Sequence, residues 1–433
     1  MRRGTSLGLT ACSGRLLPGC YVRAMSVEIR RIREDELTAY FEAMSTGFLV
    51  RPDVARLADD VRTTWDLERV WAAFDGGRIR GTFRSWPTEL TVPGGATIAA
   101  AAITNVTVVP THRRRGLMRG MTLAEHDAVR ERGEVAALLY AAEYPIYGRF
   151  GYGPACREAK WAVDVTSTTF LGERRDGVDI EAPTEEARDI IKGVFETWRT
   201  RQAGEVRRRD DRWDFELGLR EDGWDPRWKG FLALHRDSTG RVDGYARYRS
   251  EDKWERDQPR NILTVDELHA LTEDAYAALW RFLAEIDWVG TLKAERRVAG
   301  ERLPWLLTNA RAAHLTALVD GMWVRLFDLR RALEARTYER EGRVVLEVVD
   351  AEAPDGRIRL ELDAGPDGAI ARKSRRSPEL TVDVGALGAA YLGGVRLRDA
   401  TADRGADEHR AGALAKADTL LRTLVEPWCS TFF

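Results

Sequence analysis

The spacing of apolar and polar residues changes several times along the first part of the chain, and each change predicts a new element. Residues Val27–Ile32 alternate apolar and charged side chains, as a half-buried strand does, and Glu34–Met44 places apolar residues at helical spacing. Val70–Trp86 contains two strand-like runs around a Gly76-Gly77 turn, and Thr91–Pro110 continues them. A strand, a helix and an antiparallel meander together predict a mixed α/β layer.

The segment from Asn105 to Met121 joins a strand to a helix through a basic turn. The β-rich run ends at Pro110, and Gly116 introduces a helix that continues to about Arg130, with apolar residues on one stripe and charges opposite. The next buried strand is Val135–Ala141. The pattern predicts a strand–turn–helix–strand unit with three arginines on its turn.

The arginines of this turn suit an anionic ligand. A helix N-terminus gathers unpaired backbone N–H groups at the positive end of the helix dipole, and Gly116 lets the backbone approach a ligand closely. The charges of Arg113, Arg114 and Arg115 would add to this field and hold a pyrophosphate. No G-x-x-x-x-G-K-[ST] motif occurs, which argues against a nucleotide triphosphatase. From the local string alone, a solvated arginine turn is an equal alternative.

The middle of the chain repeats the opening pattern. A polar, turn-rich break at Gly172–Gly177 precedes Val178–Trp198, which again indicates a strand followed by a helix. The charged block Val206–Asp214 mixes both signs and is interpreted as a solvated face. Strand-like runs then lead to a helix at Glu273–Ile286. This region predicts a second α/β unit, which lacks an arginine-rich turn.

After about Leu315 the pattern changes again. Asp320–Tyr338 predicts a strand and a helix, and Gly342–Asp350 with Arg357–Ala364 predicts a hairpin. A further strand at Glu379–Val384 precedes a closing helix. Three such units agree with the length of 433 residues, which suggests two to four domains.

Composition and charge exclude several classes of function. The chain has 67 Lys and Arg against 69 Asp and Glu, a formal net charge of −2, so no general basic field is available for a nucleic acid. With 44% apolar and 31% charged residues, the chain has the composition of an ordinary soluble globular protein. No window approaches the roughly 18–20 uninterrupted apolar residues of a membrane span.

The cysteines and histidines are scattered. The four cysteines form no C-x-x-C pair, and the six histidines form no H-E-x-x-H motif. The sequence therefore predicts no metal site and no disulfide framework, and it indicates a reducing, cytoplasmic setting.

Residues 1–24 differ from the rest of the chain, because they are basic and contain no acid. Arg15 interrupts the only apolar stretch that could serve as a secretory signal. Leu16–Cys20 faintly resembles a lipoprotein cleavage site, although Pro18 fits poorly there. We expect a disordered or misassigned leader, with the fold starting near Met25.

Three stretches together resemble one known family. They are VTVVPTHRRRGLM at Val106–Met118, IYGRFGYGPA at Ile146–Ala155 and the aromatic chain end WCSTFF at Trp428–Phe433. At this separation the first two resemble the GNAT superfamily of acetyl-CoA-dependent N-acetyltransferases, and most of all its enhanced-intracellular-survival (Eis-type) branch. Arg113-x-x-Gly116 matches the cofactor loop of the superfamily, whereas Met118 replaces the small residue expected there.

The resemblance implies an α/β fold of mixed sheets, with tandem GNAT-like domains followed by a sterol-carrier-protein-like domain. It places an acetyl-CoA-binding domain at residues 25–165, a second GNAT-like domain without the cofactor loop at 166–315, and the sterol-carrier-like domain at 316–433. No sterol-specific motif is visible. The last domain is therefore interpreted as a scaffold that delivers the chain end to the active site of the first.

The resemblance also implies roles for single residues. Those that it assigns to acetyl-CoA are Val106, Val108, Arg113, Arg114, Arg115 and Gly116. The backbone of the two valines would pair with the pantetheine arm where two strands splay apart, and the arginine turn would hold the pyrophosphate. Tyr147 matches the general acid of the family, and the α-carboxylate of Phe433 matches its C-terminal catalytic group.

The implied acceptor is a primary amine of an aminoglycoside-like compound or of a lysine side chain. Because the acceptors of the family are polycationic, the pocket would be acid-rich, and acids within Asp53–Glu68 could contribute. The uncharged Phe432 beside the chain end argues against an aminoglycoside. The resemblance further implies a homo-oligomer, a hexamer. The alternative is a non-catalytic acyl-CoA- or lipid-binding regulatory protein on vestigial GNAT folds.

Overall fold

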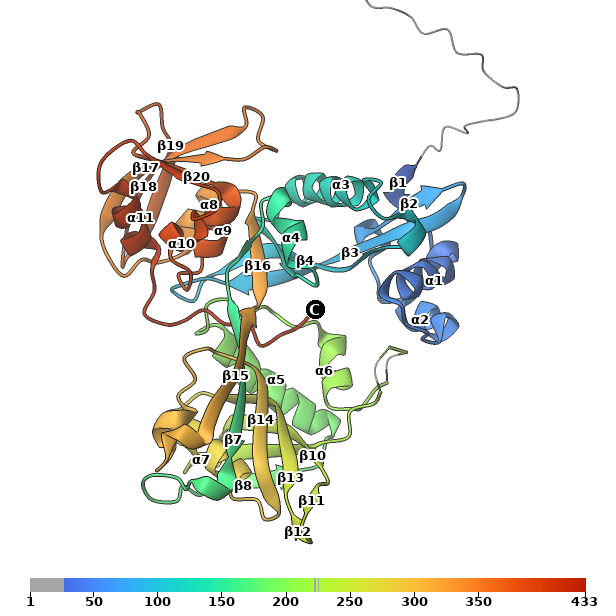
Figure 1. The fold of residues 1–433 in the computed structure, drawn as a ribbon, viewed down its shortest axis with the longest axis vertical. Helices are drawn as coiled ribbons and strands as arrows, with labels where there is room; N and C mark the ends of the chain where they lie inside the picture. Colours follow the sequence, from blue (N-terminus) through green and yellow to red (C-terminus); the bar gives the residue numbers. More distant parts are fainter. Residues whose placement is uncertain (1–26, 222, 225) are drawn as a thin grey trace, which may run out of the picture.

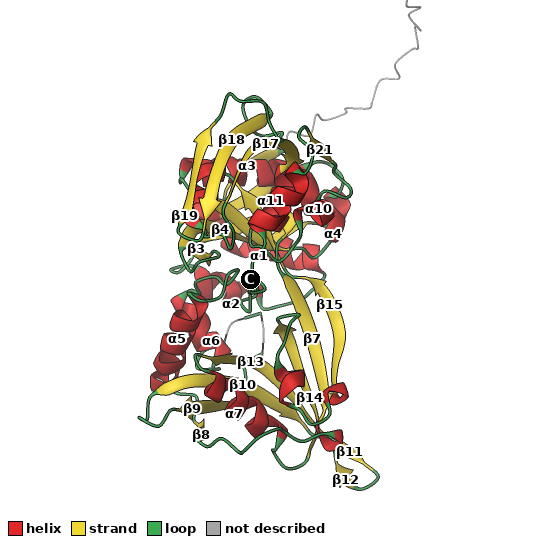
Figure 2. Cartoon of the chain, turned by 90° about the vertical axis from the view of Figure 1, so that its left-hand side faces the viewer, coloured by secondary structure: helices red, strands yellow, loops and turns green. Residues whose placement is uncertain are grey.

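The computed structural model describes residues 27–221, 223–224 and 226–433, and the expected leader at 1–24 lies outside them. Within the described residues, the main strands form two seven-stranded sheets and one five-stranded sheet. A short ribbon of β11 (Trp254–Glu255) and β12 (Gln258–Pro259) stands apart. Figures 1 and 2 show the first and third sheets together at one end of the molecule and the second sheet at the other.

The first sheet has the strand order β1-β2-β3-β4-β5-β16-β6. Its strands are β1 Glu28–Arg31, β2 Val70–Asp75, β3 Arg78–Thr91, β4 Thr97–Val108, β5 Ala136–Tyr140, β16 Met322–Leu326 and β6 Gly153–Pro154. The strands β1 to β4 form an antiparallel meander, whereas β4 and β5 are parallel because α3 (Leu117–Glu131) connects them. The predicted strand–turn–helix–strand unit is confirmed.

Helices cover both faces of this sheet, with α3 on one side and α1 (Leu37–Phe48) and α2 (Val54–Val61) on the other (Figure 1). In β2, Val70 and Ala72 join the hydrophobic cluster of α1 and α2, whereas Ala73 joins the cluster of α3. A strand buried on both faces needs apolar residues at successive positions. The run VWAAF in β2 meets that need.

The second sheet has the order β15-β7-β14-β13-β10-β9-β8. Its strands are β15 Ala313–Asp320, β7 Arg157–Asp164, β14 Val289–Arg297, β13 Asn261–Ala270, β10 Val242–Glu251, β9 Phe231–Arg236 and β8 Val178–Glu181. Its helices α5 (Glu185–Arg199) and α7 (Glu273–Ala284) pack in different hydrophobic clusters on opposite faces of the sheet. In β9, Leu234 belongs to the cluster of α5, and the adjacent Ala233 belongs to the cluster of α7. The parallel pair β13 and β14 is joined by α7, as α3 joins β4 and β5. The predicted second α/β unit is confirmed.

The third sheet, in the order β19-β18-β17-β20-β21, packs against the first. Its strands are β19 Gly368–Lys373, β18 Arg357–Gly365, β17 Gly342–Val349, β20 Leu380–Asp383 and β21 Ala406–Glu408. Its helices are α8 Leu329–Ala335, α9 Val384–Ala390, α10 Leu397–Ala400 and α11 Ala413–Leu421. One hydrophobic cluster contains both Leu138 of β5 and Leu346 of β17, so the two sheets share a core.

Two strands cross the domain boundaries that the sequence suggested. The strand β7, placed before the boundary at 165/166, pairs with β14 and β15 in the second sheet. The strand β16, placed after the boundary at 315/316, lies between β5 and β6 in the first sheet. The strand β16 therefore follows every strand of the second sheet in the sequence but pairs within the first sheet. Its main-chain hydrogen bonds fix the two units to each other.

Candidate active site

The strands β4 and β5 separate partway along their length. They pair only from Ala100 to Ala102 on β4, opposite Ala136 to Leu138 on β5. The strand β4 continues to Val108 and stays paired with β3, where the register shifts between Thr82 and Arg84. Both predicted pantetheine-binding positions, Val106 and Val108, lie beyond the point where β5 departs. On the β5 side, no described strand pairs with this end of β4.

The basic turn leads from this end of β4 into α3. Gly116 is the N-cap of α3 and has a φ of 82°, and a Cβ built there would meet no atom within 4 Å. Glycine is thus favoured here by its backbone conformation, not by lack of space. Arg114 also has a positive φ, 62°, and its side chain is exposed. The first-turn N–H groups of α3 have no acceptors within the helix and are left for other partners.

The three arginines of the turn have different surroundings. The guanidinium of Arg113 donates to the carbonyl of Val108 at 3.2 Å and to that of Gly47, near the end of α1, at 3.1 Å. Arg115 lies 3.6 Å from the carboxylate of Asp75, and Nε2 of His112 is within 3.1 Å of the same oxygen. Arg113 therefore holds the turn to its neighbours, while the backbone of the turn is left to contact a ligand.

Tyr147 ends the short helix α4 (Tyr144–Tyr147), which follows β5. Its side chain is buried in the cluster that contains Leu139 and Val106, on the α3 side of the sheet. Burial, with the nearby Glu143 carboxylate, raises the pKa of Tyr147 to about 12. Within the described residues, its hydroxyl makes no hydrogen bond.

The three neighbouring tyrosines are occupied elsewhere. The hydroxyl of Tyr152 lies 3.0 Å from Nε2 of His126, and that of Tyr140 donates to the carbonyl of Thr431 at 2.9 Å. The ring of Tyr144 is largely exposed and packs edge-on against Trp323. Among the described residues, Tyr147 is thus a buried tyrosine of this group whose hydroxyl makes no hydrogen bond, whereas Tyr140 and Tyr152 are buried with bonded hydroxyls and Tyr144 is exposed.

The last residues of the chain are held between the first and second sheets (Figures 1 and 2). The buried carboxylate of Glu205 accepts hydrogen bonds from both the backbone N–H and the hydroxyl of Ser430, each at 2.7 Å. Nε of Arg208 donates to the hydroxyl of Thr431 at 2.9 Å. The ring of Phe433 packs edge-on against Trp86, with ring centroids 5.6 Å apart. The aromatic chain end is therefore an ordered part of the fold.

Tyr147 and Phe433 lie on opposite faces of the first sheet. Leu139 of β5 faces the cluster of Tyr147, whereas Leu138 and Tyr140 face the cluster against which Phe433 packs. Figure 1 shows α4 on the upper side of this sheet and the chain end beneath it. Beyond Ala102 and Leu138 the two strands no longer pair, so the sheet has no β4–β5 hydrogen bonds between the two faces there.

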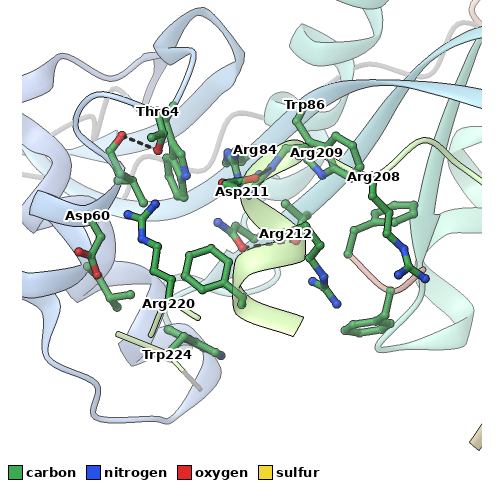
Figure 3. A pocket seen from close by; sticks show the side chains of 18 of the residues that line it. Asp60, Thr64, Arg84, Trp86, Arg208, Arg209, Asp211, Arg212, Arg220 and Trp224 are labelled. Carbon is green, nitrogen blue, oxygen red and sulfur yellow. Dashed lines mark hydrogen bonds and ion pairs between the residues drawn. The ribbon is translucent and has the colours of Figure 1, made fainter. Parts of the chain in front are cut away.

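A cavity of about 320 Å³ lies at the chain end, between α1, α2, the strands β3 and β4, and α6 (Asp210–Glu216) (Figure 3). We call it the chain-end cavity. Among the described residues, its charged lining side chains are five arginines and two aspartates: Arg84, Arg208, Arg209, Arg212, Arg220, Asp60 and Asp211. The expected acid-rich pocket is therefore not what lies beside Phe433. Of the acids within Asp53–Glu68, only Asp60 lines the cavity.

The charged block Val206–Asp214 is not the solvated face that its sequence suggested. Val206 and Arg208 are buried, and the guanidinium of Arg208 contacts the carboxylates of Glu216 and Glu267. A buried arginine is usually paired in this way, and of these two partners Glu216 lies 8 residues from Arg208 in sequence and Glu267 lies 59 residues away. The only local sign is an apolar Val206 and a Trp213 among the charges.

Two features of the described residues bear on the class of site. Among residues 27–433, apart from 222 and 225, no group of three or more His, Cys, Asp or Glu is arranged to hold a metal ion. No helix in the same residues combines the length and apolar character that crossing a membrane demands.

Family models match three regions of the chain. An acetyltransferase (GNAT) domain matches residues 28–155, a second acetyltransferase (GNAT) domain matches 204–326, and a sterol carrier protein domain matches 329–430. An uncharacterized N-acetyltransferase of Streptomyces avermitilis is 40% identical over 95% of this chain and its own full length. The N-acetyltransferase Eis of Mycobacterium tuberculosis is 34% identical over 80% of each chain.

Solved structures give the same picture of the whole chain. The crystal structure of Eis1 from Mycobacterium abscessus matches with a TM-score of 0.82 and 30% identity, covering 94% of this chain and 100% of its own. A GCN5-related N-acetyltransferase from Anabaena variabilis has a TM-score of 0.81 over the same shares at 18% identity, which shows the shared fold.

Proposed function

Because this chain belongs to the Eis-type branch of the GNAT acetyltransferases, we propose that it moves the acetyl group of acetyl-CoA directly to a primary amine held in the chain-end cavity. The observation that carries the proposal is the end of pairing between β4 and β5, with Tyr147 on one face of the sheet and the chain end on the other. A thioester bound where the strands part would lie between the two groups that the reaction needs.

The cofactor would enter from the α3 side. The free edge of β4 around Val106 and Val108 offers backbone groups to the amides of the pantetheine arm. The turn at Arg113–Gly116 would hold the pyrophosphate through the N–H groups and dipole of α3, with the charges of Arg114 and Arg115 added. The corresponding turn in the second unit, between β13 and α7, carries no arginine. We therefore assign acetyl-CoA binding to the first unit.

The proposed reaction uses a proton donor on one face of the first sheet and a proton acceptor on the other. The neutral amine nitrogen attacks the thioester carbonyl carbon, a C–N bond forms, and the C–S bond breaks. The departing thiolate takes a proton from the Tyr147 hydroxyl, and the new ammonium gives one to the α-carboxylate of Phe433, directly or through water. An α-carboxyl group with a pKa near 3.5 is ionised at neutral pH and can accept that proton. The products are an amide and the free thiol of CoA.

The function is tested by the release of free thiol from acetyl-CoA in the presence of a panel of primary amines. We expect thiol release that depends on both the amine and the enzyme. We also expect acetyl-CoA to raise the melting temperature, by an amount equivalent to about 2.7 kcal/mol at a hundred times its Kd. Stabilisation without thiol release from any amine would favour the non-catalytic acyl-CoA-binding alternative. The absence of both stabilisation and thiol release would reject both the enzyme and the acyl-CoA-binding protein.

The pH dependence follows from the raised pKa of Tyr147. A tyrosine whose pKa is about 12 keeps its proton at every pH below that value, so the acid form is present throughout the neutral and alkaline range. The acceptor amine must lose its proton, so kcat/KM should rise with pH toward the pKa of the amine. We expect a rising profile between pH 6 and 10 with no descending limb. A descending limb with its midpoint below pH 10 would contradict Tyr147 as the acid.

A further inference from the structure

Among the described residues, two arginines of the chain-end cavity have no anionic partner. Of the five arginines of the described lining, Arg208 pairs with Glu216, Arg212 with Glu216, and Arg209 with Asp211 through two hydrogen bonds. Within the same residues, neither Arg84 nor Arg220 lies within ion-pair distance of a carboxylate. Both side chains line the cavity, and Figure 3 labels them.

Arg84 is the more unusual of the two. It lies on β3, only 8% of its surface is exposed, and its guanidinium stacks on the ring of Trp65 at 3.9 Å. Burial, together with the nearby charge of Arg209, lowers the pKa of Arg84 to about 9. A buried guanidinium is normally paired, because the loss of its hydration is otherwise uncompensated. A ligand anion within the cavity would supply that compensation.

Arg220 faces the same space from the segment after α6. Its guanidinium lies 5.2 Å from the ring centre of Phe215, which itself lines the cavity. Cation–π contact leaves the N–H groups of a guanidinium free for an anion. Together, Arg84 and Arg220 offer two sets of N–H donors to one ligand.

The acidic groups of the cavity are less available. Asp211 is held by Arg209 on both of its oxygens, at 3.0 and 2.9 Å. Asp60 lies 3.8 Å from Arg56, a residue that does not line the cavity, and its buried Oδ2 makes no hydrogen bond within the described residues. Within the same residues, the carboxylate of Phe433 forms no ion pair. The described lining therefore holds five guanidinium groups against the carboxylates of Asp60, Asp211 and Phe433, and this excess of positive charge does not suit a polycation.

Apart from Thr64, Thr104, Asn105 and Thr431, the uncharged residues of the described lining are apolar, and many are aromatic. They include Phe41, Met44, Trp65, Trp86 and Phe215. A volume of about 320 Å³ is at the lower end of the range for small-molecule sites, so a compact ligand is favoured over an aminoglycoside-sized one.

We propose that the natural acceptor is a compact amine with an apolar, preferably aromatic, body and an anionic group, carboxylate or phosphoryl, at the end opposite to its amine. This inference rests on the proposed acetyl transfer. The amine is held beside the carboxylate of Phe433, and the anion is held by Arg84 and Arg220. The cavity thereby selects against a second positive charge, which would face the two guanidinium groups.

The test compares amines of one shape and different charge. The probes are 4-(aminomethyl)benzoate, its phosphonate analogue, the neutral 4-methylbenzylamine and the dication 1,4-bis(aminomethyl)benzene, each assayed by thiol release from acetyl-CoA. We expect kcat/KM for the better anionic probe to exceed that of the neutral amine by about tenfold or more, the effect of a charge-assisted hydrogen bond. The dication should be the poorest, and the two anionic probes distinguish a carboxylate from a phosphoryl group.

Variants identify the residue responsible. Arg84→Met should reduce the anionic-over-neutral ratio of kcat/KM toward one, and Arg84→Lys should retain part of it. Arg212→Gln is the matched control, because Arg212 lines the same cavity but is bound to Glu216 at 2.7 Å. In the control we expect the ratio to persist. Stabilisation by acetyl-CoA, which binds on the other face of the sheet, verifies that each variant is folded.

The outcomes separate this inference from the proposed function. If the dication is the best acceptor, or if the ratio survives in Arg84→Met, the inference is wrong while acetyl transfer stands. If no amine releases thiol, acetyl transfer is wrong, and calorimetric binding of 4-(aminomethyl)benzoate and the dication decides the inference instead. Tighter binding of the anion supports the charge assignment, and equal or tighter binding of the dication overturns it.

Discussion

A single glycine added after Phe433 is expected to lower kcat by about a hundredfold, with little change in the affinity for acetyl-CoA. One more residue moves the α-carboxylate by up to about 3.5 Å, and misplacement of a reacting group by 1 Å can produce a loss of this size. The new end would also intrude on the cavity between Trp86 and the arginines. The measurements are steady-state thiol release and the shift in melting temperature with acetyl-CoA.

The anchoring of the chain end makes this prediction specific. Glu205 holds Ser430, and both Tyr140 and Arg208 hold Thr431, so the residues before Phe433 should keep their places in the extended protein. The matched control is one glycine inserted after Asp367, in the exposed turn between β18 and β19. That variant should turn over like the parent. Unchanged kcat in the protein extended at its end would refute a catalytic role for the carboxylate.

The parts of this molecule that could be predicted from sequence are those set by local patterns. The turn at Arg113–Gly116 is recognisable because a strand, a glycine with a positive φ and an amphipathic helix succeed one another within one short segment. The same locality explains why the hairpins and the strand–helix openings of the first two units are where the sequence placed them. Each depends on neighbours within a few residues.

The parts that could not be predicted depend on contacts between distant segments. The pairing of β16 with β5 joins one strand that precedes the second unit in the sequence to one that follows it. Nothing in the β16 sequence MWVRL specifies that partner. Arg208 has the sequence surroundings of a solvated charge, yet carboxylates from α6 and β13 enclose it. Arg84 stands in a strand whose alternation suggests exposure, and its burial results from Trp65 covering it. The charge of the chain-end cavity could not be predicted from sequence for this reason.

Replacing Tyr147 by phenylalanine should lower kcat by about a hundredfold or more, the usual contribution of a general acid. The ring and its packing are retained, so binding of acetyl-CoA should change little. Tyr144→Phe is the matched control, because Tyr144 lies in the same short helix with its side chain largely exposed. We expect that variant to keep the parent's kcat. Both are measured by thiol release, with thermal stabilisation by acetyl-CoA as the check on folding.

The result for Tyr147→Phe also decides whether another group could protonate the thiolate. The hydroxyls of Tyr140 and Tyr152 are bound to Thr431 and His126, and burial raises the pKa of both far above its usual value. Neither can turn to the thioester without breaking its hydrogen bond. If the variant retained the parent's kcat, solvent would therefore be the remaining source of the proton. A loss of activity confined to Tyr147→Phe would place the acid on the α3 face, across the sheet from the carboxylate that receives the amine's proton.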